Sequence, residues 1–596
     1  MKYNQKLFNN LVKKYEVELI KKLKNVKDKL FLVTLELENK KAFFSIAPLS
    51  MAVHNLEGDM HVVVKDKKSK TLAILKEVWN TYEDKKSRLK TPKVKALAAW
   101  INSVNKRTKT KVFKNIFQGP EIMLKAGKNG FSGTFNLKYH YSWHRYYKWK
   151  EVQQTAKTIL TQGYGLKKDE KFGLGFVLVP SRKDLGLPLE DYLDSFSISY
   201  AFATIAKKLK TKVSMNAYST RSSILANSIR SADLLSTLIG CELDKDVNEE
   251  VFQKFKVVSK LLKINRIELS DAAFGVHGKG YAGKFFFGEH IGYPTLDRKT
   301  RWSSPGQMLL KDRYETQTKY EKRDPKMRYG ITETLPIDIF IETCNVNYDK
   351  IRARSLRIKK LLDKCQKIRV IGKEINGYKT DLEVGLLTKE GVRREFIAND
   401  SDLRSNIDKE YFEKTGIKAG CYANFPSGET FVTPENVKGL FIGDVVISVD
   451  RSIMIPENNP LIISVKKNKY KIVDGPKKLV AKMQKQLSDS RQKIRNIEAN
   501  KSLPISITKM YRQNFNAIGE FAINLNPKAK LCDYLIVNEK IARMIHIALG
   551  MGFEPDRKTV YHWDIVINSP KQKLDIYGVD KKKKVHWIIK KGNFVV

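Results

Sequence analysis

The last third of the chain carries carboxylate and imidazole side chains at positions where β-strands could gather them. In the segment HWDIVIN (562–568), strand alternation puts His562 and Asp564 on one face and their apolar neighbours on the other. In GEFAINLN (519–526), the same alternation puts Glu520 opposite the apolar face. His546 lies inside the apolar run RMIHIALG, and Glu429 follows the turn NFPSG. These five side chains are the candidates for chemistry.

Oxygen and nitrogen donors without thiolates suit Zn, Mn or Co. A carboxylate shared by two such ions would hold them about 3.5–4 Å apart, where they could activate one water. Taken singly, a histidine in an apolar run is more often a satisfied core residue, and this alternative stays open for His546. Five such groups together favour a metal site.

Four segments, in this order along the chain, resemble the M29 family of metallo-aminopeptidases, also called the aminopeptidase T or thermophilic aminopeptidase family. They are NFPSGETFVTP (424–434), GEFAINLN (519–526), NEKIARMIHIALG (538–550) and YHWDIV (561–566). Upstream, IRVIGKEINGYKTDLEVGL (368–386) looks like the strand pair that opens the catalytic domain of that family. The resemblance spans roughly residues 345–596.

The resemblance implies a metal-dependent aminopeptidase that hydrolyses N-terminal residues from peptides through a dinuclear metal site and a metal-bound hydroxide. Its cofactors would be two divalent metal ions, Zn, Mn or Co. Carried over residue by residue, the metal ligands are Glu429, Glu520, His546, His562 and Asp564. Glu520 falls at the bridging position and is the first catalytic candidate.

One position departs from the pattern of the family. The family carries a tyrosine seven residues after the histidine of HIALG, close to the metals, and this chain has Phe553 there, at the expected substrate-binding position. Tyr561, directly before His562, could supply the missing hydroxyl and is the second catalytic candidate.

The elements that would position these residues differ along the chain. Residues 29–66 spell strand, helix, strand, and the alternation continues to about residue 340, which predicts an α/β N-terminal region with parallel sheet units. This region holds a lysine- and aromatic-rich insert at about 70–170, and residues 274–330 are expected to form loops. Residues 341–596 predict an α+β catalytic domain with a largely antiparallel sheet and one long helix near 477–499. No internal repeat is visible.

Two further motifs have competing interpretations. The cluster KYHYSWHRYYKWK (138–150) interleaves aromatic and basic side chains, as an RNA-stacking surface would, but a half-buried element of the insert explains it as well. Gly278, Gly280 and Gly283 spell G-x-G-x-x-G, but no strand is predicted before them and no helix after them, so dinucleotide binding is not favoured.

The chain has 596 residues, which predicts two or three domains, and 111 Lys and Arg against 64 Asp and Glu give a net charge of +47. This charge is typical either of lysine-rich solvated faces or of a polyanion partner, and it cannot choose between them. The alternative function is therefore a catalytically weakened M29-like protein that binds RNA or another polyanion through its basic surface.

The compartment and partners follow from what the sequence lacks. Five cysteines without a C-x-x-C motif indicate a reducing compartment. No apolar run approaches the length of a membrane span. We expect a cytoplasmic homodimer without membrane contact that acts on peptide substrates, with at most weak, non-specific binding of nucleic acid.

Overall fold

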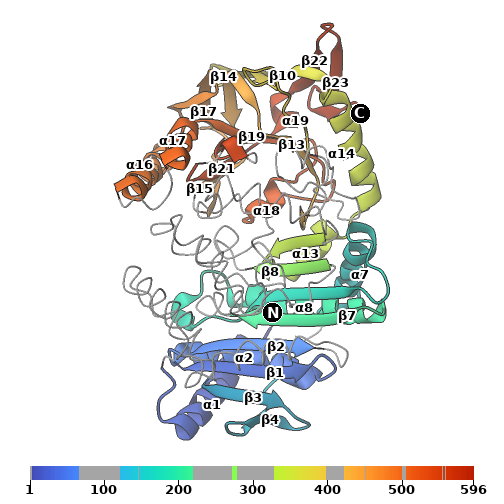
Figure 1. Cartoon of the computed structure of the whole chain (residues 1–596), viewed down its shortest axis with the longest axis vertical. Coiled ribbons are helices and arrows are strands. Elements are labelled where there is room, and N and C mark those ends of the chain that lie inside the picture. The colour runs from blue at the N-terminus through green and yellow to red at the C-terminus, as the bar shows by residue number, and fades with distance from the viewer. Residues whose placement is uncertain are drawn as a thin grey trace, which may run out of the picture.

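The computed structural model describes residues 3–27, 29–65, 121–144, 147–218, 272–277, 328–397, 422–449, 451–499, 505–552, 555–557 and 559–596. Much of the predicted insert, the three glycines of the G-x-G-x-x-G motif and Phe553 lie outside these residues. Within them, the chain forms one mixed sheet in the lower half of Figure 1 and two antiparallel sheets in the upper half. None of the described helices combines the length and the apolar character that a membrane span requires.

The first sheet has ten strands. In order across the sheet they are β12 (Tyr422–Asn424), β9 (Arg328–Glu333), β8 (Ala272–His277), β6 (Lys171–Val177), β7 (Lys212–Tyr218), β2 (Asp59–Lys65), β1 (Leu30–Glu36), β3 (Ile122–Ala126), β4 (Gly130–Gly133) and β5 (Leu137–Lys138). The pairs from β12 to β7 and from β2 to β3 are parallel, which agrees with the parallel units predicted for this region.

Two units of this sheet have the same strand–helix–strand connectivity, although no internal repeat is visible in the sequence. In the first, helix α2 (Lys40–Asn55) connects β1 to β2, and in the second, α8 (Leu189–Lys208) connects β6 to β7. An antiparallel contact between β2 and β7 joins the two units, and β3 and β8 flank them in equivalent positions. Both helices are buried along most of their length, as expected for helices that cover a parallel sheet.

The expectation of loops across residues 274–330 was wrong at both ends of that stretch. Strand β8 covers 272–277 and pairs in parallel with β6 and β9, and β9 begins at Arg328. A strand therefore ends directly before Gly278. The sequence predicted no strand there, which counted against dinucleotide binding by the G-x-G-x-x-G motif, and that part of the argument was wrong. Both strands are short and contain glycine, which weakens their strand signal in the sequence.

The N-terminal helix α1 (Gln5–Leu23) is amphipathic, and it buries Leu11, Tyr15 and Leu19. The aromatic cluster packs beside it. Trp143 is only 1% exposed, and its indole N–H donates to the carbonyl of Phe44 at 2.8 Å. Trp143 is therefore a core residue of the N-terminal region and presents no face for base stacking.

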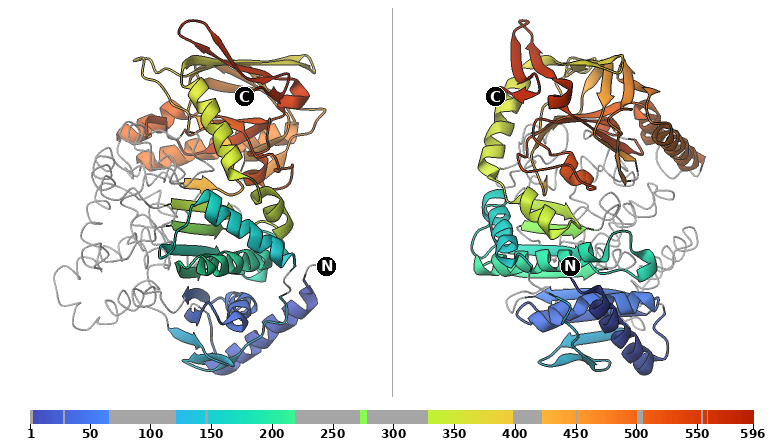
Figure 2. Two further views of the ribbon diagram at one scale, coloured as in Figure 1. Left: turned by 90° about the vertical axis from the view of Figure 1, so that its right-hand side faces the viewer. Right: turned by 180° about the vertical axis from the view of Figure 1, so that it is seen from behind.

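The C-terminal part begins with helices α13 (Ile337–Cys344) and α14 (Tyr348–Leu362), and Figure 2 shows α14 running between the lower and upper halves. An eight-stranded antiparallel sheet follows. Its strands in order are β18 (Lys469–Asp474), β17 (Leu461–Lys466), β14 (Glu435–Gly443), β11 (Tyr378–Gly385), β10 (Cys365–Ile375), β22 (Asp575–Asp580), β23 (Val585–Lys590) and β24 (Asn593–Phe594).

The second antiparallel sheet has six strands and carries the candidate site. In order they are β13 (Glu429–Val432), β19 (Ile518–Asn524), β20 (Ile545–Gly550), β21 (His562–Ile567), β15 (Val446–Val449) and β16 (Arg451–Met454). Helices α16 (Lys477–Ala499) and α17 (Ile505–Asn514) lie at the edge of this region, and α16 is the predicted long helix. The short strand β12, at 422–424, pairs with β9, so the C-terminal part also completes the edge of the first sheet.

The burial of Trp143 generates a test against the RNA-stacking interpretation. We expect Trp143→Ala to lower the free energy of unfolding of the N-terminal region by about 3–5 kcal/mol, because a large buried side chain and its hydrogen bond are lost. Tyr147→Ala, at a side chain that is 41% exposed, should change it by less than about 0.5 kcal/mol. Urea denaturation measures both, and a Trp143→Ala protein of unchanged stability would contradict the assignment to the core.

Candidate metal centre

The register of the six-stranded sheet brings the candidate residues to one face. Glu520 on β19 lies opposite Ala548 on β20, and Ala548 lies opposite Asp564 on β21. Residues directly opposite each other in antiparallel strands share a face. The methyl group of Ala548 therefore separates the two carboxylates and leaves space above the central strand. A bulge at 519, between Ile518 and Glu520, shifts β19 into this register.

Gly519 makes that bulge possible. A Cβ atom at this position would lie 2.1 Å from the carbonyl oxygen of Met551, which no larger residue could tolerate without backbone movement.

Glu429 enters the same face from the outer strand β13, where it lies opposite Asn524. The preceding turn is held by Asn526, whose amide donates to the carbonyl of Ser427 at 3.0 Å. Gly428 in this turn has φ +126°, in the left-handed region that favours glycine, and its carbonyl accepts from the N–H of Leu525 at 2.7 Å. The turn thus fixes where β13 begins and where Glu429 points.

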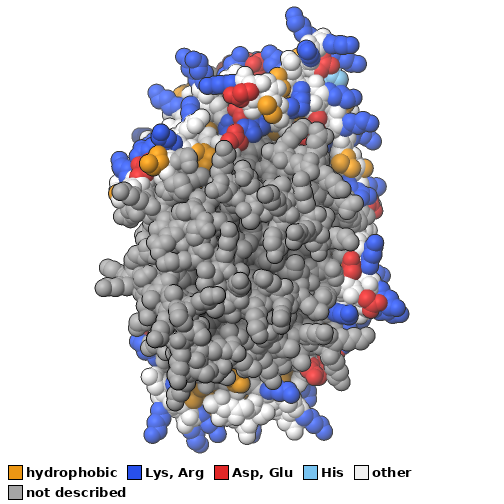
Figure 3. Space-filling view, in the orientation of Figure 1, with side chains coloured by type: hydrophobic (Ala, Val, Ile, Leu, Met, Phe, Trp, Pro, Cys, Tyr) orange, Lys and Arg blue, Asp and Glu red, His pale blue; other side chains and the backbone are white. Residues whose placement is uncertain are grey.

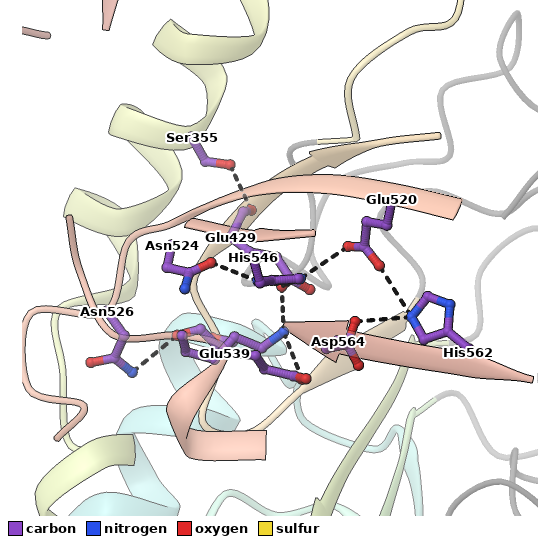
Figure 4. Close-up of polar contacts among 11 residues, drawn as sticks. Ser355, Glu429, Glu520, Asn524, Asn526, Glu539, His546, His562 and Asp564 are labelled. Carbon is purple, nitrogen blue, oxygen red and sulfur yellow. Dashed lines mark hydrogen bonds and ion pairs between the residues drawn. The ribbon is translucent and has the colours of Figure 1, made fainter. Parts of the chain in front are cut away.

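The structure brings all five predicted ligand residues together (Figure 4). The two oxygens of Glu520 face different histidines, at 3.3 Å from Nε2 of His546 and 3.4 Å from Nε2 of His562. Asp564 lies 3.1 Å from His562 Nε2, and Glu429 lies 3.6 Å from His546 Nε2. Glu520, Glu429 and His546 form one group and Glu520, His562 and Asp564 another, and within each group the ligand atoms lie within 4.8 Å of one another.

Both histidines are held through the ring nitrogen that faces away from the cluster. His546 Nδ1 lies 2.8 Å from the side-chain oxygen of Asn524, and His562 Nδ1 lies 2.7 Å from the carbonyl oxygen of Met551. A carbonyl oxygen only accepts, so Nδ1 carries the proton and donates it. This arrangement orients Nε2 toward the carboxylates and is the support that metal-bound histidines commonly have.

Two charged residues of the cluster were not among the sequence candidates. Lys540 is 1% exposed, and its ammonium group lies 2.5 Å from Glu429 Oε2 and 3.2 Å from Glu539 Oε1. Glu539 and Lys540 both belong to the segment NEKIARMIHIALG. An acidic and a basic residue next to each other and close to an apolar run were the sequence signal that could have identified them. Asn524, the partner of His546, was not among the sequence candidates either.

The electrostatics of the cluster follow from burial and pairing. Burial opposes ionisation of Glu520, but its hydrogen bonds with His546 and His562 outweigh this and lower its pKa. Burial likewise opposes ionisation of Asp564, whose pKa the charge of His562 lowers to about 2. For His546, burial favours the neutral ring, but the bond to Glu520 raises its pKa to about 9. Burial also favours the neutral ring of His562, but the charge of Asp564 raises its pKa well above the ordinary value. In the metal-free protein the carboxylates therefore hold protons on both imidazoles.

These donors fit divalent cations. Burial raises the pKa of Glu539, so the ionised carboxylates are those of Glu429, Glu520 and Asp564, and Lys540 is the one permanent cation among the described residues of the cluster. Divalent ions could take the place of the two histidine protons as the remaining counter-charge. Carboxylate oxygens and imidazole nitrogens without a thiolate suit Zn, Mn or Co. Glu520, shared by the two groups, would be the bridging ligand.

Of the remaining two predicted site residues, the structure describes Tyr561 alone. Tyr561 is buried, and its hydroxyl donates to the carbonyl of Phe515 and lies 2.7 Å from the hydroxyl of Tyr470. Burial raises the pKa of Tyr561 well above its ordinary value. These contacts occupy the hydroxyl in the core and do not bring it to the cluster. Phe553 lies outside the described residues.

Comparisons with known proteins give a distant likeness only. No family model matches the chain, and no curated protein matches it. Among solved structures, wild-type AmpT from Thermus thermophilus is similar at 12% sequence identity with a TM-score of 0.39, and the match covers 75% of this chain and 99% of that chain. A TM-score this low carries no argument, so the functional case depends on the geometry of the cluster.

The pairing of His546 predicts how the metal-free protein responds to pH. Because its pKa is raised to about 9, the protonated imidazole stabilises the fold fully below its ordinary pKa, and this contribution is lost as pH rises through 9. We expect the free energy of unfolding of chelator-treated protein to fall by on the order of a few kcal/mol between pH 6 and pH 10. Urea denaturation across this range measures it, and a flat profile would contradict the ionised pairing.

Proposed function

We propose that the chain is a metal-dependent aminopeptidase that hydrolyses N-terminal residues from peptides with two divalent ions, Zn, Mn or Co. The observation that carries the proposal is Glu520, whose two oxygens face different histidines in two adjoining ligand groups. A shared carboxylate is the feature that distinguishes a dinuclear site from two unrelated ion pairs. The fold supports it, since one sheet face supplies all five donors.

The chemistry divides between the ions and the chain. Divalent ions bound here would activate a water molecule and polarise the scissile carbonyl. The chain keeps Glu520 and Asp564 ionised at neutral pH, and Asn524 and the Met551 carbonyl hold the Nδ1 protons of the two histidines.

The other partners remain proposals. On the face drawn in Figure 3, Lys and Arg side chains lie at the top, the bottom and the edges of the described surface rather than in one patch. Weak, non-specific contact with polyanions therefore stays a proposal that rests on the net charge of +47. A cytoplasmic homodimer remains the expected state of the protein.

Metal content and hydrolysis test the proposal together. Purified protein supplied with Zn or Mn should hold up to two ions and cleave aminoacyl-arylamides, and a chelator should remove both properties. Glu520→Gln should lose at least one ion and lower kcat by at least ~10²-fold, because the shared ligand of both groups is weakened.

His586→Asn is the matched control, since it removes an imidazole that pairs with Asp580 at 2.9 Å on the hairpin of β22 and β23. It should leave metal content and kcat unchanged. Full metal content in Glu520→Gln combined with His546→Ala would overturn the assignment.

The two aromatic positions give a separate prediction. If Phe553 replaces a hydroxyl that assists the reaction, Phe553→Tyr should raise kcat by up to ~10²-fold with metal affinity unchanged. Tyr561→Phe should lower stability by about 1 kcal/mol, through its lost bond to Phe515, and leave kcat within a factor of two. Steady-state kinetics on arylamides measure both. Loss of activity in Tyr561→Phe at full metal content would show that this hydroxyl reaches the substrate.

A further inference from the structure

A cavity of about 320 Å³ lies between helices α16 and α17 and strand β18, and none of the residues that line it belongs to the metal cluster. It is lined by Lys469, Arg491, Ile494, Arg495, Arg512, Phe515 and Asn516. Helix α16 supplies three of these residues, and the others come from β18, α17 and the segment after α17. Helix α16 therefore forms one wall of the cavity.

The lining is strongly cationic. Arg512 forms an ion pair with Glu498, and its Nε lies 2.7 Å from the carboxylate. Among the residues that the structure describes, Glu498 is the sole carboxylate paired with any of the four cations of the lining. Arg495 donates to the neutral side chain of Gln492 at 3.0 Å, and Lys469 donates to a backbone carbonyl. Three cations of the lining, Lys469, Arg491 and Arg495, therefore have no carboxylate partner among the described residues.

The floor of the cavity is apolar and offers one unused polar atom. Phe515 and Ile494 are buried, and the guanidinium carbon of Arg491 lies 4.9 Å from the centre of the Phe515 ring. Within the described part of the chain, the buried side-chain oxygen of Asn516 has no hydrogen-bond partner. A ligand that fits must bring negative charge, an apolar surface and a hydrogen-bond donor.

We propose that this cavity binds a small organic phosphate. Guanidinium groups present fixed forks of N–H donors that match phosphate oxygens, and three arginines converge here. The volume lies at the lower end of the range for small-molecule sites, so it suits a compact ligand and is too small for an extended nucleic-acid strand. The site is independent of the proposed peptidase chemistry.

Calorimetric titration of the full chain tests the proposal with AMP, inorganic phosphate and adenosine. AMP should bind at least tenfold more tightly than phosphate, because its ring and hydroxyl groups add contacts, and adenosine should not bind measurably. Arg491→Gln with Arg495→Gln should weaken AMP binding at least tenfold. Lys485→Gln is the control on the same helix, since Lys485 pairs with Asp489 and does not line the cavity.

Glu498→Gln is a second variant, and its expected effect is tighter binding, which misfolding would not produce. Removing the carboxylate that competes for Arg512 should tighten AMP binding several-fold. AMP affinity that is equal in the wild type and in the double arginine variant would overturn the proposal, and would point to phosphate binding at the metal cluster instead. Binding of single-stranded RNA, without AMP binding, that the arginine substitutions reduce would also overturn it in favour of an extended polyanion.

Discussion

The buried negative charge on the face of the six-stranded sheet constrains the rest of this part of the structure. Glu429, Glu520 and Asp564 are almost fully buried, and taking an ionised carboxylate out of water costs several kcal/mol unless a counter-charge compensates it. Lys540 compensates one carboxylate permanently. The two histidines compensate the others by holding protons, or they give up those protons to divalent ions. The same residues can thus satisfy the fold and hold metal.

The sheet meets this constraint through small residues and through neighbouring hydrogen bonds. Ala548 stands between Glu520 and Asp564, and Ala522 stands opposite His546, so the charged groups have space above the strands. The glycine at 519 allows the bulge that sets the register of Glu520. Asn524 then orients His546 from the same strand as Glu520.

Strand alternation was sufficient to place the candidate ligands on common faces, because a two-residue period depends only on local geometry. The mixed and antiparallel sheets followed from the same local patterns. Long-range contacts could not be predicted in this way. Lys540 contacts Glu429, more than a hundred residues away in the sequence, and the hydroxyl of Tyr561 contacts that of Tyr470. Local sequence patterns cannot predict either contact. Strands β8 and β9 were missed since they are short, contain glycine and gain stability from parallel neighbours.

Anomalous diffraction from crystals grown with Zn tests the central claim most directly, because it locates the ions rather than their effect. The account predicts two peaks on opposite sides of the Glu520 carboxylate, one beside Glu429 and His546 and the other beside His562 and Asp564. Crystals with bound Zn elsewhere and no peak at Glu520 would contradict it, and would mean that protonated histidines and Lys540 alone balance the buried charge.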